Sequence, residues 1–434
     1  ALERVLKLLS VGSKRFLINK VDRSVTGLIA AQQGCGPLHL PVGDYGIIAQ
    51  SHFPNESGIY TGAAIAMGEQ PVKMLVDIEA GAHLSVIEAL TNIAFANISC
   101  LEDIKFSGNW MWAAKLKGEG SKLYRAAVAI RDLMVKLGVA IDGGKDSLTM
   151  GANVPCSDGS VEIVKSPSQF LATGYCSVPD ITKKVTPDIK HPGKSCLMRI
   201  DLGNRKRRLG GSALAQVYKQ IGNDCPDVEQ PELVVAAFKA INELIDKKLV
   251  LAAHDISDGG FVCTALEMAF AGNCGLVLNI DCDDEDIMKE LFAEEAGWII
   301  EYDSNNQNLV NDILKDIPQH CLIFAGETMP EKNIIIFDEE GEFYFKEEMV
   351  KLRQIWEETS FQLEKLQSNP VTAEAEKENI YNRPGPNYTL SFSPQPTLDI
   401  FLNRSNKPKV AIIREEGSNG DREMTSAFHH AGFE

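Results

Sequence analysis

The stretch from Leu249 to Phe270 constrains the fold of this chain more than any other. The apolar run Leu249–Ala252 leads into the polar turn 253–258, which contains His254, Asp255, Ser257 and Asp258; a glycine pair and a second apolar run follow. This order predicts a buried strand, a turn and a helix. Such a turn presents backbone N–H groups and carboxylates to a phosphate and its metal. The alternative is an ordinary helix N-cap, although a cap needs only one Asp or Ser.

Two other segments offer oxygen ligands. The apolar residues of Leu84–Ala96 follow helical spacing, which places Glu88 and Asn92 one turn apart on one face of an expected helix. Asp44 lies between two glycines at the start of the expected strand Pro41–Gln50, where backbone can approach a ligand closely. Carboxylate and amide oxygens suit Mg²⁺. The alternative for the Glu88/Asn92 pair is a solvated helix face.

The order of these motifs resembles one family. Pro-Val-Gly-Asp (41–44), Glu-Ala-Leu-Thr-Asn (88–92), Gly-Gly-Lys-Asp-Ser (143–147) and His-Asp-Ile-Ser-Asp-Gly-Gly (254–260) occur in sequence. In this order they resemble the phosphoribosylformylglycinamidine synthases, in their large single-chain form. Aminoimidazole ribonucleotide synthetase and selenophosphate synthetase share the ATP-binding architecture, so the last segment decides between them. Lys409–Gly420 resembles the first strand and turn of the glutamine amidotransferase domain that the large synthase carries.

The resemblance implies an α+β or α/β fold, with an aminoimidazole-ribonucleotide-synthetase-like two-domain ATP-binding unit. A flavodoxin-like class I glutaminase domain would begin behind it. The complete enzyme carries the two-domain unit twice, related by a pseudo-twofold, and this chain would be the second copy within a longer polypeptide. The expected parts are an entry segment (1–30), an N-type domain (31–182), a C-type domain (195–345), a helix and linker (346–407) and the start of the amidotransferase domain (408–434).

The resemblance also implies roles for individual residues. It names no catalytic residue in this chain. The expected ligands of Mg²⁺ that bridge the phosphates of ATP or ADP are Asp44, Glu88, Asn92 and Asp255. Gly43, Ser257 and Lys14 would contact the nucleotide, and the alternative for Lys14 is a surface lysine. Gly210, Gly211 and Ser212 precede a helix and would form a nest of N–H groups for the substrate phosphate.

Two further features each allow two interpretations. In Gly143–Ser147 the glycines predict a tight turn, at which Lys145 and Asp146 meet either substrate or the other copy; the alternative is a type I turn with a capping Asp. His254 precedes an expected metal ligand, and we interpret it as a packing or supporting residue rather than a catalytic one.

The implied reaction consumes ATP, formylglycinamide ribonucleotide, glutamine and water. It yields formylglycinamidine ribonucleotide, ADP, phosphate and glutamate, in purine biosynthesis. One alternative is a stand-alone ATP-using synthetase of the aminoimidazole ribonucleotide synthetase superfamily. Another is a non-catalytic half that holds a structural nucleotide. The implied partners are these small molecules, an N-terminal half and an amidotransferase domain.

Composition excludes several other classes. The net charge is −17, and Arg205–Arg208 is the only basic run, which argues against nucleic acid and acidic membranes as partners. The ten cysteines include no C-x-x-C pair, so a zinc ribbon is not expected. Such dispersed thiols are typical of a protein in a reducing compartment. No signal peptide or long apolar run is visible, and the expected location is the cytoplasm.

Local patterns predict the remaining elements. The expected strands are Pro41–Gln50, Val72–Ile78, Ile104–Asn109, Val139–Asp142, Phe170–Val178, Cys196–Leu202, Leu249–Ala252, Gly275–Ile280, Gly297–Tyr302 and Cys321–Gly326. The expected helices are Leu2–Leu9, Leu84–Ala96, Leu123–Leu137, Ser212–Gln220, Glu232–Lys247, Gly259–Ala271, Asp284–Leu291 and Glu347–Leu366. The proline-containing segments Lys183–Lys194 and Gln367–Pro408 are expected to be connectors.

Overall fold

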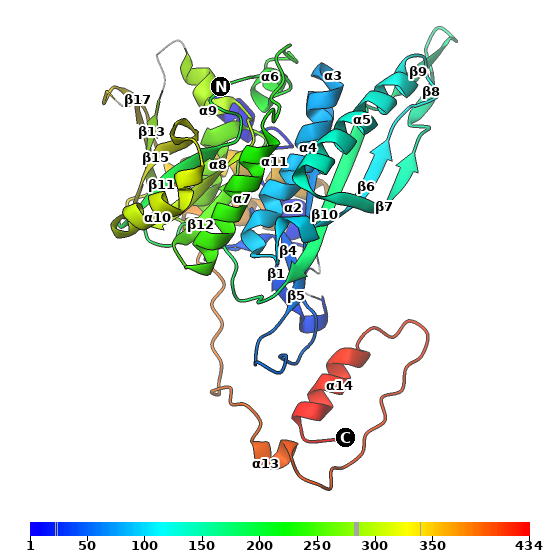
Figure 1. Ribbon diagram of the computed structural model, residues 1–434, viewed down its shortest axis with the longest axis vertical. Helices are drawn as coiled ribbons and strands as arrows, with labels where there is room; N and C mark the ends of the chain where they lie inside the picture. The colour runs from blue at the N-terminus through cyan, green and yellow to red at the C-terminus, as the bar shows by residue number, and fades with distance from the viewer. Residues whose placement is uncertain (22, 24, 282–285, 339) are drawn as a thin grey trace.

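Two β-sheets, each with helices packed on it, lie side by side in the main body of this computed structural model (Figure 1). The structure describes residues 1–21, 23, 25–281, 286–338 and 340–434. The start of the helix expected at Asp284, and Cys282, lie outside the described residues. No described helix is long and apolar enough to cross a bilayer.

The first sheet has six strands in the order β1-β4-β5-β10-β6-β7. Its strands span Ile29–Ala31 (β1), Gly46–Ala49 (β4), Gly62–Glu69 (β5), Lys105–Met111 (β6), Ala140–Ser147 (β7) and Gln169–Val178 (β10). Helix α4 (Ile78–Ile93) packs on β5 and β10, and α5 (Glu119–Leu137) packs beside α4. Hairpins β2–β3 (Gly34–Cys35, Leu40–Pro41) and β8–β9 (Gly151–Pro155, Val161–Lys165) complete this half.

The second sheet has seven strands in the order β12-β14-β11-β15-β13-β16-β17. Its strands span Ser195–Asp201 (β11), Val250–Asp255 (β12), Gly275–Ile280 (β13), Gly297–Asp303 (β14), Leu322–Met329 (β15), Asn333–Asp338 (β16) and Phe343–Glu348 (β17). Its helices are α6 (Ala213–Val217), α7 (Pro231–Asp246), α8 (Gly260–Gly272), α9 (Ile287–Phe292) and α10 (Gln307–Ile313). Because α5 packs against α7, one hydrophobic core runs through both halves.

The N-terminal segment packs on the second half. Helices α1 (Leu2–Leu6) and α2 (Arg15–Ile18) both contact α11 (Met349–Gln367). Trp356 of α11 is buried and donates its indole N–H to the carbonyl of Val11 at 3.0 Å. The N-terminal helices therefore pack directly on α11, near the C-terminal end of the main body. This packing also positions Lys14, which lies just before α2.

Several sequence-based predictions were wrong. Val72–Ile78 was expected to be a strand, but α3 (Pro71–Val76) is a helix with proline at its first position, where the missing N–H costs nothing. The preceding strand β5 was missed because it is built largely of glycine and alanine. Gly143–Ser147 was expected to be a tight turn. It continues strand β7, where a Cβ at Gly144 would lie 2.0 Å from the carbonyl oxygen of Gly108.

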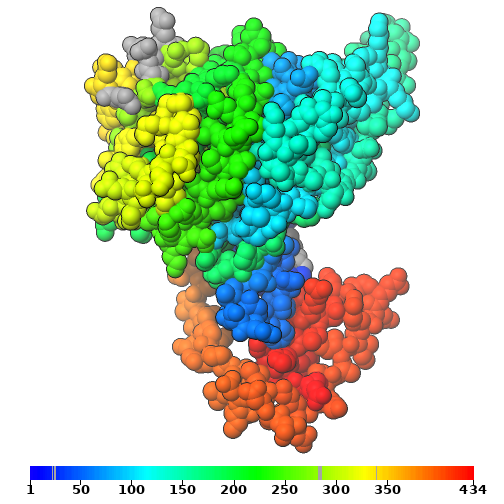
Figure 2. Space-filling view, viewed as in Figure 1, coloured from blue at the N-terminus to red at the C-terminus, as the bar shows by residue number. Residues whose placement is uncertain are grey.

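The C-terminal connector is partly helical. Within the expected connector Gln367–Pro408, residues Pro370–Glu378 form α12 and Asp399–Leu402 form α13. An extended stretch leads from the main body to α13 and to α14 (Asp421–His430), which lie below the first half in Figures 1 and 2. Phe53 contacts the rings of His429 and His430 there, at centroid distances of 5.0 and 5.1 Å.

The segment expected to be a glutaminase strand is not assigned as a strand. Residues 409–414 belong to neither a helix nor a strand, and α14 follows at Asp421. The N–H of Val410 donates to the carbonyl of Glu434 at 2.8 Å, and the N–H of Glu434 donates to Pro408 at 2.9 Å. This alternation is the hydrogen-bond pattern of neighbouring parallel strands.

A histidine contact between the halves gives the first prediction. His83 of α4 lies 2.9 Å from Asp227, from the segment before α7. Burial lowers the pKa of His83, but the hydrogen bond to Asp227 outweighs it and the pKa is raised. The stabilisation is therefore full below the unfolded pKa of about 6.5 and is lost as pH rises through the folded pKa. Urea unfolding from pH 5.5 to 9 should show His83→Gln less stable by about 1–2 kcal/mol at low pH only. If His83→Gln were less stable than the unaltered protein by the same amount at every pH, this prediction would be wrong.

Candidate functional site

The polar turn expected at 253–258 is shorter in the structure, because β12 extends to Asp255 and only residues 256–259 separate it from α8. Gly259 has φ +93°, and a Cβ there would lie 2.5 Å from the sulfur of Cys263. Its N–H donates to the carboxylate of Glu294 at 2.8 Å. The turn therefore requires glycine for its backbone conformation and for the close approach of α8.

Asp44 and Asp255 meet beside His254. Ligand atoms of these three residues lie within 4.8 Å of one another. His254 Nδ1 is 2.6 Å from Asp44 and 3.7 Å from Asp255, while its Nε2 is 3.2 Å from Glu267. Although burial lowers the pKa of His254, Asp44 and Glu267 hold that pKa well above its usual range. The histidine thus lies between carboxylates and is held in place by them.

The side chains of the two aspartates are buried beside this histidine. Their side chains are 2% and 4% exposed, and one oxygen of each, Oδ2, has no hydrogen-bond partner among the described residues. Burial raises the pKa of Asp44, and burial together with the charge of Asp44 raises that of Asp255 to about 8. Buried carboxylates of this kind need a cation to stay ionised at neutral pH. The residues present therefore fit a divalent metal.

Helix α4 brings Glu88 toward this pair. Trp298, the β14 residue paired with Asp255, donates its indole N–H to the carbonyl of Thr91 at 2.9 Å. Burial and the nearby charge of Asp255 raise the pKa of Glu88 well above its usual value. The carboxylate of Glu88 accepts the N–H of Glu69 at 2.6 Å.

Asn92 lies one helical turn beyond Glu88. Its amide nitrogen donates to the carbonyl of Met67 at 3.0 Å. That bond fixes the orientation of the amide group, whose oxygen is the atom that a hard metal would use.

A buried lysine joins the two halves beside the site and was missed in the sequence. Lys73 of α3 lies 2.6 Å from Glu294 and 3.8 Å from Asp258 of the polar turn. It also donates to Gln70 at 2.7 Å, and Gln70 donates to Glu88 at 3.0 Å. Burial lowers the pKa of Lys73, but Glu294 and Asp258 raise it overall. The signal for Glu294 was present: it begins an acidic pair between two apolar runs.

The expected nucleotide contacts differ in their surroundings. Ser257 is half-buried and lines the same cleft as Lys73 and Glu88. The ammonium of Lys14 donates to the carbonyls of Ser10 and Gly12 at 3.0 and 2.5 Å. Burial lowers the pKa of Lys14, and the charges of Glu267 and Asp258 oppose that shift, which places the ammonium in the field of the acidic cluster.

Gly43 does not present its N–H to a ligand. Its N–H donates to the carbonyl of Gln33 at 2.9 Å, and a Cβ would lie 2.8 Å from the carbonyl oxygen of Gln32. The absence of a side chain at Gly43 therefore lets two backbone segments pack closely, just before Asp44.

The nest expected at Gly210, Gly211 and Ser212 is not formed. Their three N–H groups donate to the carbonyls of Asp224, Ile221 and Leu209, at 2.7, 2.6 and 3.2 Å. The next N–H, of Ala213, donates to Glu294 at 2.8 Å. Because these N–H groups all donate to acceptors within the protein, none of them is available to bind a phosphate.

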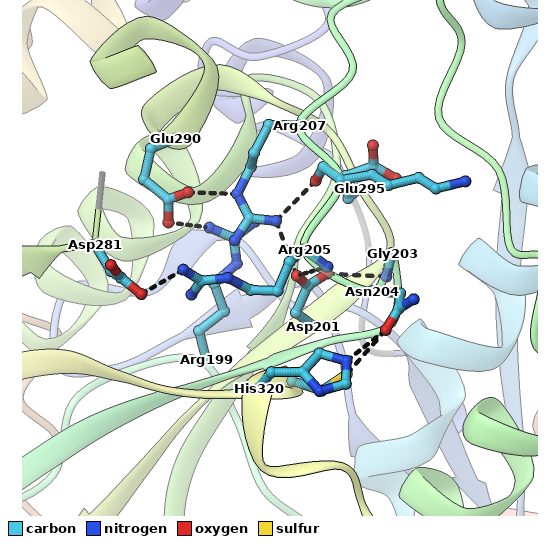
Figure 3. A network of polar contacts seen from close by, with 12 residues as sticks. Arg199, Asp201, Gly203, Asn204, Arg205, Arg207, Asp281, Glu290, Glu295 and His320 are labelled. Carbon is cyan, nitrogen blue, oxygen red and sulfur yellow. Dashed lines mark hydrogen bonds and ion pairs between the residues drawn. The ribbon is translucent and has the colours of Figure 1, made fainter. Parts of the chain in front are cut away.

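The basic run 205–208 is neutralised within the fold (Figure 3). Arg207 pairs with Glu290 and, at 2.8 Å, with Asp201; Arg205 pairs with Asp281. Arg208 pairs with Glu295 and Glu229, each at 2.8 Å. The run is thus neither a solvated loop nor an open anion site, and it ties the segment before α6 to the second sheet.

Comparisons with known proteins agree with this architecture. Residues 13–177 match the sequence family described as FGAR-AT PurM_N-like domain, and residues 200–318 match the AIR synthase related protein, C-terminal domain. The structure of T. maritima PurL complexed with FGAR has a TM-score of 0.56 at 13% identity, over 81% of this chain and 52% of that one. Phosphoribosylformylglycinamidine synthase II from Thermotoga maritima gives 0.53 at 13% identity, over 81% and 51%.

The fold and the two matched families define an AIR-synthase-related two-domain unit. Sequence relatives specify it further. Phosphoribosylformylglycinamidine synthase of Homo sapiens is 47% identical over 438 residues, which is 100% of this chain and 32% of that protein. The Dictyostelium discoideum synthase is 46% identical over 457 residues, 100% and 33%. The chain belongs to the phosphoribosylformylglycinamidine synthase family and spans about a third of the length of these relatives.

The rigid turn gives the second prediction. Gly259→Val should abolish nucleotide binding and lower the melting temperature, because valine disfavours φ +93° and its side chain would meet Cys263. Equilibrium dialysis with labelled ADP and Mg²⁺ would measure binding. Gly417→Val, at a positive-φ glycine with nothing within 4 Å, is the matched control for backbone strain alone. If Gly259→Val binds ADP like the unaltered protein, the turn is not a phosphate-binding element.

Proposed function

We propose that Asp44, Glu88, Asn92 and Asp255 hold Mg²⁺ and that this metal binds the phosphates of ATP or ADP. The observation that carries this proposal is the pair of buried carboxylates with unpartnered oxygens at Asp44 and Asp255. The bound metal would neutralise charge on the phosphate chain. Ser257 would donate its hydroxyl to a phosphate, and Lys14 would add a positive charge after leaving its carbonyl partners.

We infer the reaction from family membership together with this site. The whole protein would convert formylglycinamide ribonucleotide to formylglycinamidine ribonucleotide, using ATP and ammonia from glutamine, as a ligase in the cytoplasm. The parallel hydrogen-bond pattern between 408–410 and Glu434 supports the start of an amidotransferase sheet in the tail. Within the whole protein, this chain would bind a nucleotide and pack against the N-terminal half and the amidotransferase domain.

A second function of the same site has support of its own. The expected metal ligands Asp44 and Asp255 are almost completely buried, and Lys73 ties the cleft to both halves of the molecule. A nucleotide held there would act as a structural element that exchanges slowly. Nucleotide that copurifies with the protein and does not exchange with labelled ADP during turnover would favour this role over a catalytic one.

The uncovered face of the first sheet is our candidate surface for the other copy of the unit. On β4, β5 and β10 several outward side chains are large and apolar, with Ile48, Ile65, Met67 and Tyr175 at 51%, 48%, 58% and 37% exposure. Adjacent apolar side chains of this size usually mark an interface. We therefore propose that the N-terminal half of the whole protein covers this face.

The function is tested by comparing two polypeptides, which gives the third prediction. The full-length protein should release ADP only when formylglycinamide ribonucleotide and either glutamine or ammonium are present. Residues 1–434 alone should show no turnover and should self-associate through the uncovered sheet face, as sedimentation would reveal. Substrate-dependent turnover by residues 1–434 with ammonium would show that one copy of the two-domain unit suffices, against this prediction. If the full-length protein showed no substrate-dependent turnover, the proposed reaction would be wrong.

A further inference from the structure

A second polar cavity lies away from the metal-binding cluster, between the N-terminal segment and the connector that leaves α12. It has a volume of about 360 Å³, and its lining includes Arg15, Lys20, Arg23, Arg383, Glu376 and Tyr388. Nothing in the proposed reaction uses these residues. The lining thus brings four cationic side chains together with one carboxylate.

Two of the cations are accounted for by ion pairs within the fold. Arg15 is buried and contacts Glu364 and Glu376, and its guanidinium lies over the ring of Phe361. Lys20 lies 2.6 Å from Glu376 and 3.2 Å from Glu364. These pairs tie α2 to α11 and α12, so their role is structural.

Among the residues that the structure describes, the other two cations have only neutral hydrogen-bond partners. Arg23 donates to the side-chain oxygen of Gln32 at 2.9 Å and to the carbonyl of Ile18 at 3.5 Å. Arg383 donates to the carbonyl of Leu38 at 3.4 Å. Among the described residues, neither guanidinium has a carboxylate within the 4.0 Å of an ion pair. Both arginines are half-buried, so water compensates their charge only in part.

The local charge is therefore positive. Burial lowers the pKa of the neighbouring Arg353, and although Glu357 opposes this shift, the charge of Arg383 lowers it further. The wall that carries Arg383 is packed tightly, because a Cβ at Gly385 would lie 1.8 Å from the carbonyl oxygen of Pro37. The connector therefore packs against the segment before β3, and both guanidinium groups are among the residues that line the cavity.

We propose that this cavity binds the phosphate monoester of a small metabolite through Arg23 and Arg383. A guanidinium group can donate two parallel hydrogen bonds to the oxygens of one phosphate. A dianionic phosphate would also give Arg23 and Arg383 the direct anionic partner that neither has among the described residues. The volume exceeds what a bare phosphate fills and is within the range of small-molecule sites. Tyr388 and His39 line the remaining space and offer ring faces and polar atoms to the organic part.

Calorimetric titration with ribose 5-phosphate tests the proposal. The titration is done on the full-length protein in EDTA at low salt, so that the metal-dependent nucleotide site does not contribute. We expect a saturable site, in addition to any binding at the substrate's own site, that is weakened about tenfold or more in Arg23→Gln/Arg383→Gln. Arg125→Gln/Arg131→Gln, which removes two exposed arginines on α5, is the matched control and should bind like the unaltered protein. No saturable binding, or equal weakening in both double variants, would overturn the proposal.

A second measurement does not depend on the variants folding. Tyr388 lines the cavity and is 81% exposed, so chymotrypsin should cleave after it. Ribose 5-phosphate should slow this cleavage in the unaltered protein, and it should do so equally in EDTA, because the metal-dependent nucleotide site is separate. An unchanged cleavage rate would also overturn the proposal.

Discussion

Asp255→Asn is expected to abolish metal-dependent nucleotide retention while leaving the fold intact. The substitution removes one of two buried carboxylates whose free oxygens would balance the charge of Mg²⁺. Loss of a direct ligand should weaken Mg²⁺–nucleotide binding by at least about 100-fold, more than loss of a supporting residue usually does. Metal analysis and nucleotide mass spectrometry on the purified variant measure it. Asp246→Asn, at an exposed aspartate paired with Lys183, is the control.

The same variant carries a stability signature with a defined sign. In the metal-free protein the pKa of Asp255 is raised to about 8, above its unfolded value. Its contribution to stability is therefore full below the unfolded pKa of about 4 and is lost as pH rises through 8. Asparagine resembles the neutral acid and does not titrate. In EDTA, Asp255→Asn should gain in melting temperature relative to the unaltered protein from pH 5 to 8. A variant that retains Mg²⁺ and nucleotide at unaltered stoichiometry would contradict the assignment.

Lys73→Met should destabilise the protein by about 3–5 kcal/mol, the usual cost of leaving a buried charge without its partner. Lys73 is 2% exposed and neutralises Glu294, which also accepts the N–H groups of Gly259 and Ala213. Because Lys73 belongs to the first half and Glu294 to the second, the loss should loosen the contact between them. Urea unfolding, followed by fluorescence of the buried tryptophans, gives the free energy of unfolding.

A second substitution separates charge from packing at this position. Adding Glu294→Gln to Lys73→Met removes the stranded carboxylate, so the double variant should recover more than half of the lost stability. Lys247→Met, which breaks an exposed pair with Glu243, should leave the midpoint unchanged. If the double variant is as unstable as the sum of the two single variants, Lys73 and Glu294 are not coupled.

The strand, turn and helix around Asp255 could be predicted because local signals agreed there. An apolar run, a polar turn and a glycine pair produced β12, the turn and α8, close to the expected bounds. The predictions for α4 and α7 held for the same reason, since their apolar residues follow helical spacing over four turns. By contrast β5, built of small residues, and β17, with several charged ones, carry weak signals, and only their neighbours in the sheet make them strands.

The site could be predicted only in part. Asp44 and Asp255 meet as the motifs implied, and Glu88 approaches them on α4. Lys73 and Glu294 were missed because they are distant in sequence and become partners only when the two halves pack. At Gly210–Ser212 the glycines resembled a phosphate nest, but the N–H groups close a loop instead. A glycine pattern shows that backbone approaches something closely, and only the folded chain shows what it approaches.

The most direct test of the central claim is a crystal structure of the full-length protein with ADP and Mn²⁺, read by anomalous scattering of the manganese. We predict manganese peaks at coordination distance, about 2.2 Å, from oxygens of Asp44, Glu88, Asn92 and Asp255, with the ADP phosphates on the other side of the metal. Manganese and ADP bound elsewhere, with Asp44 still against His254 and no peak between the two aspartates, would contradict it.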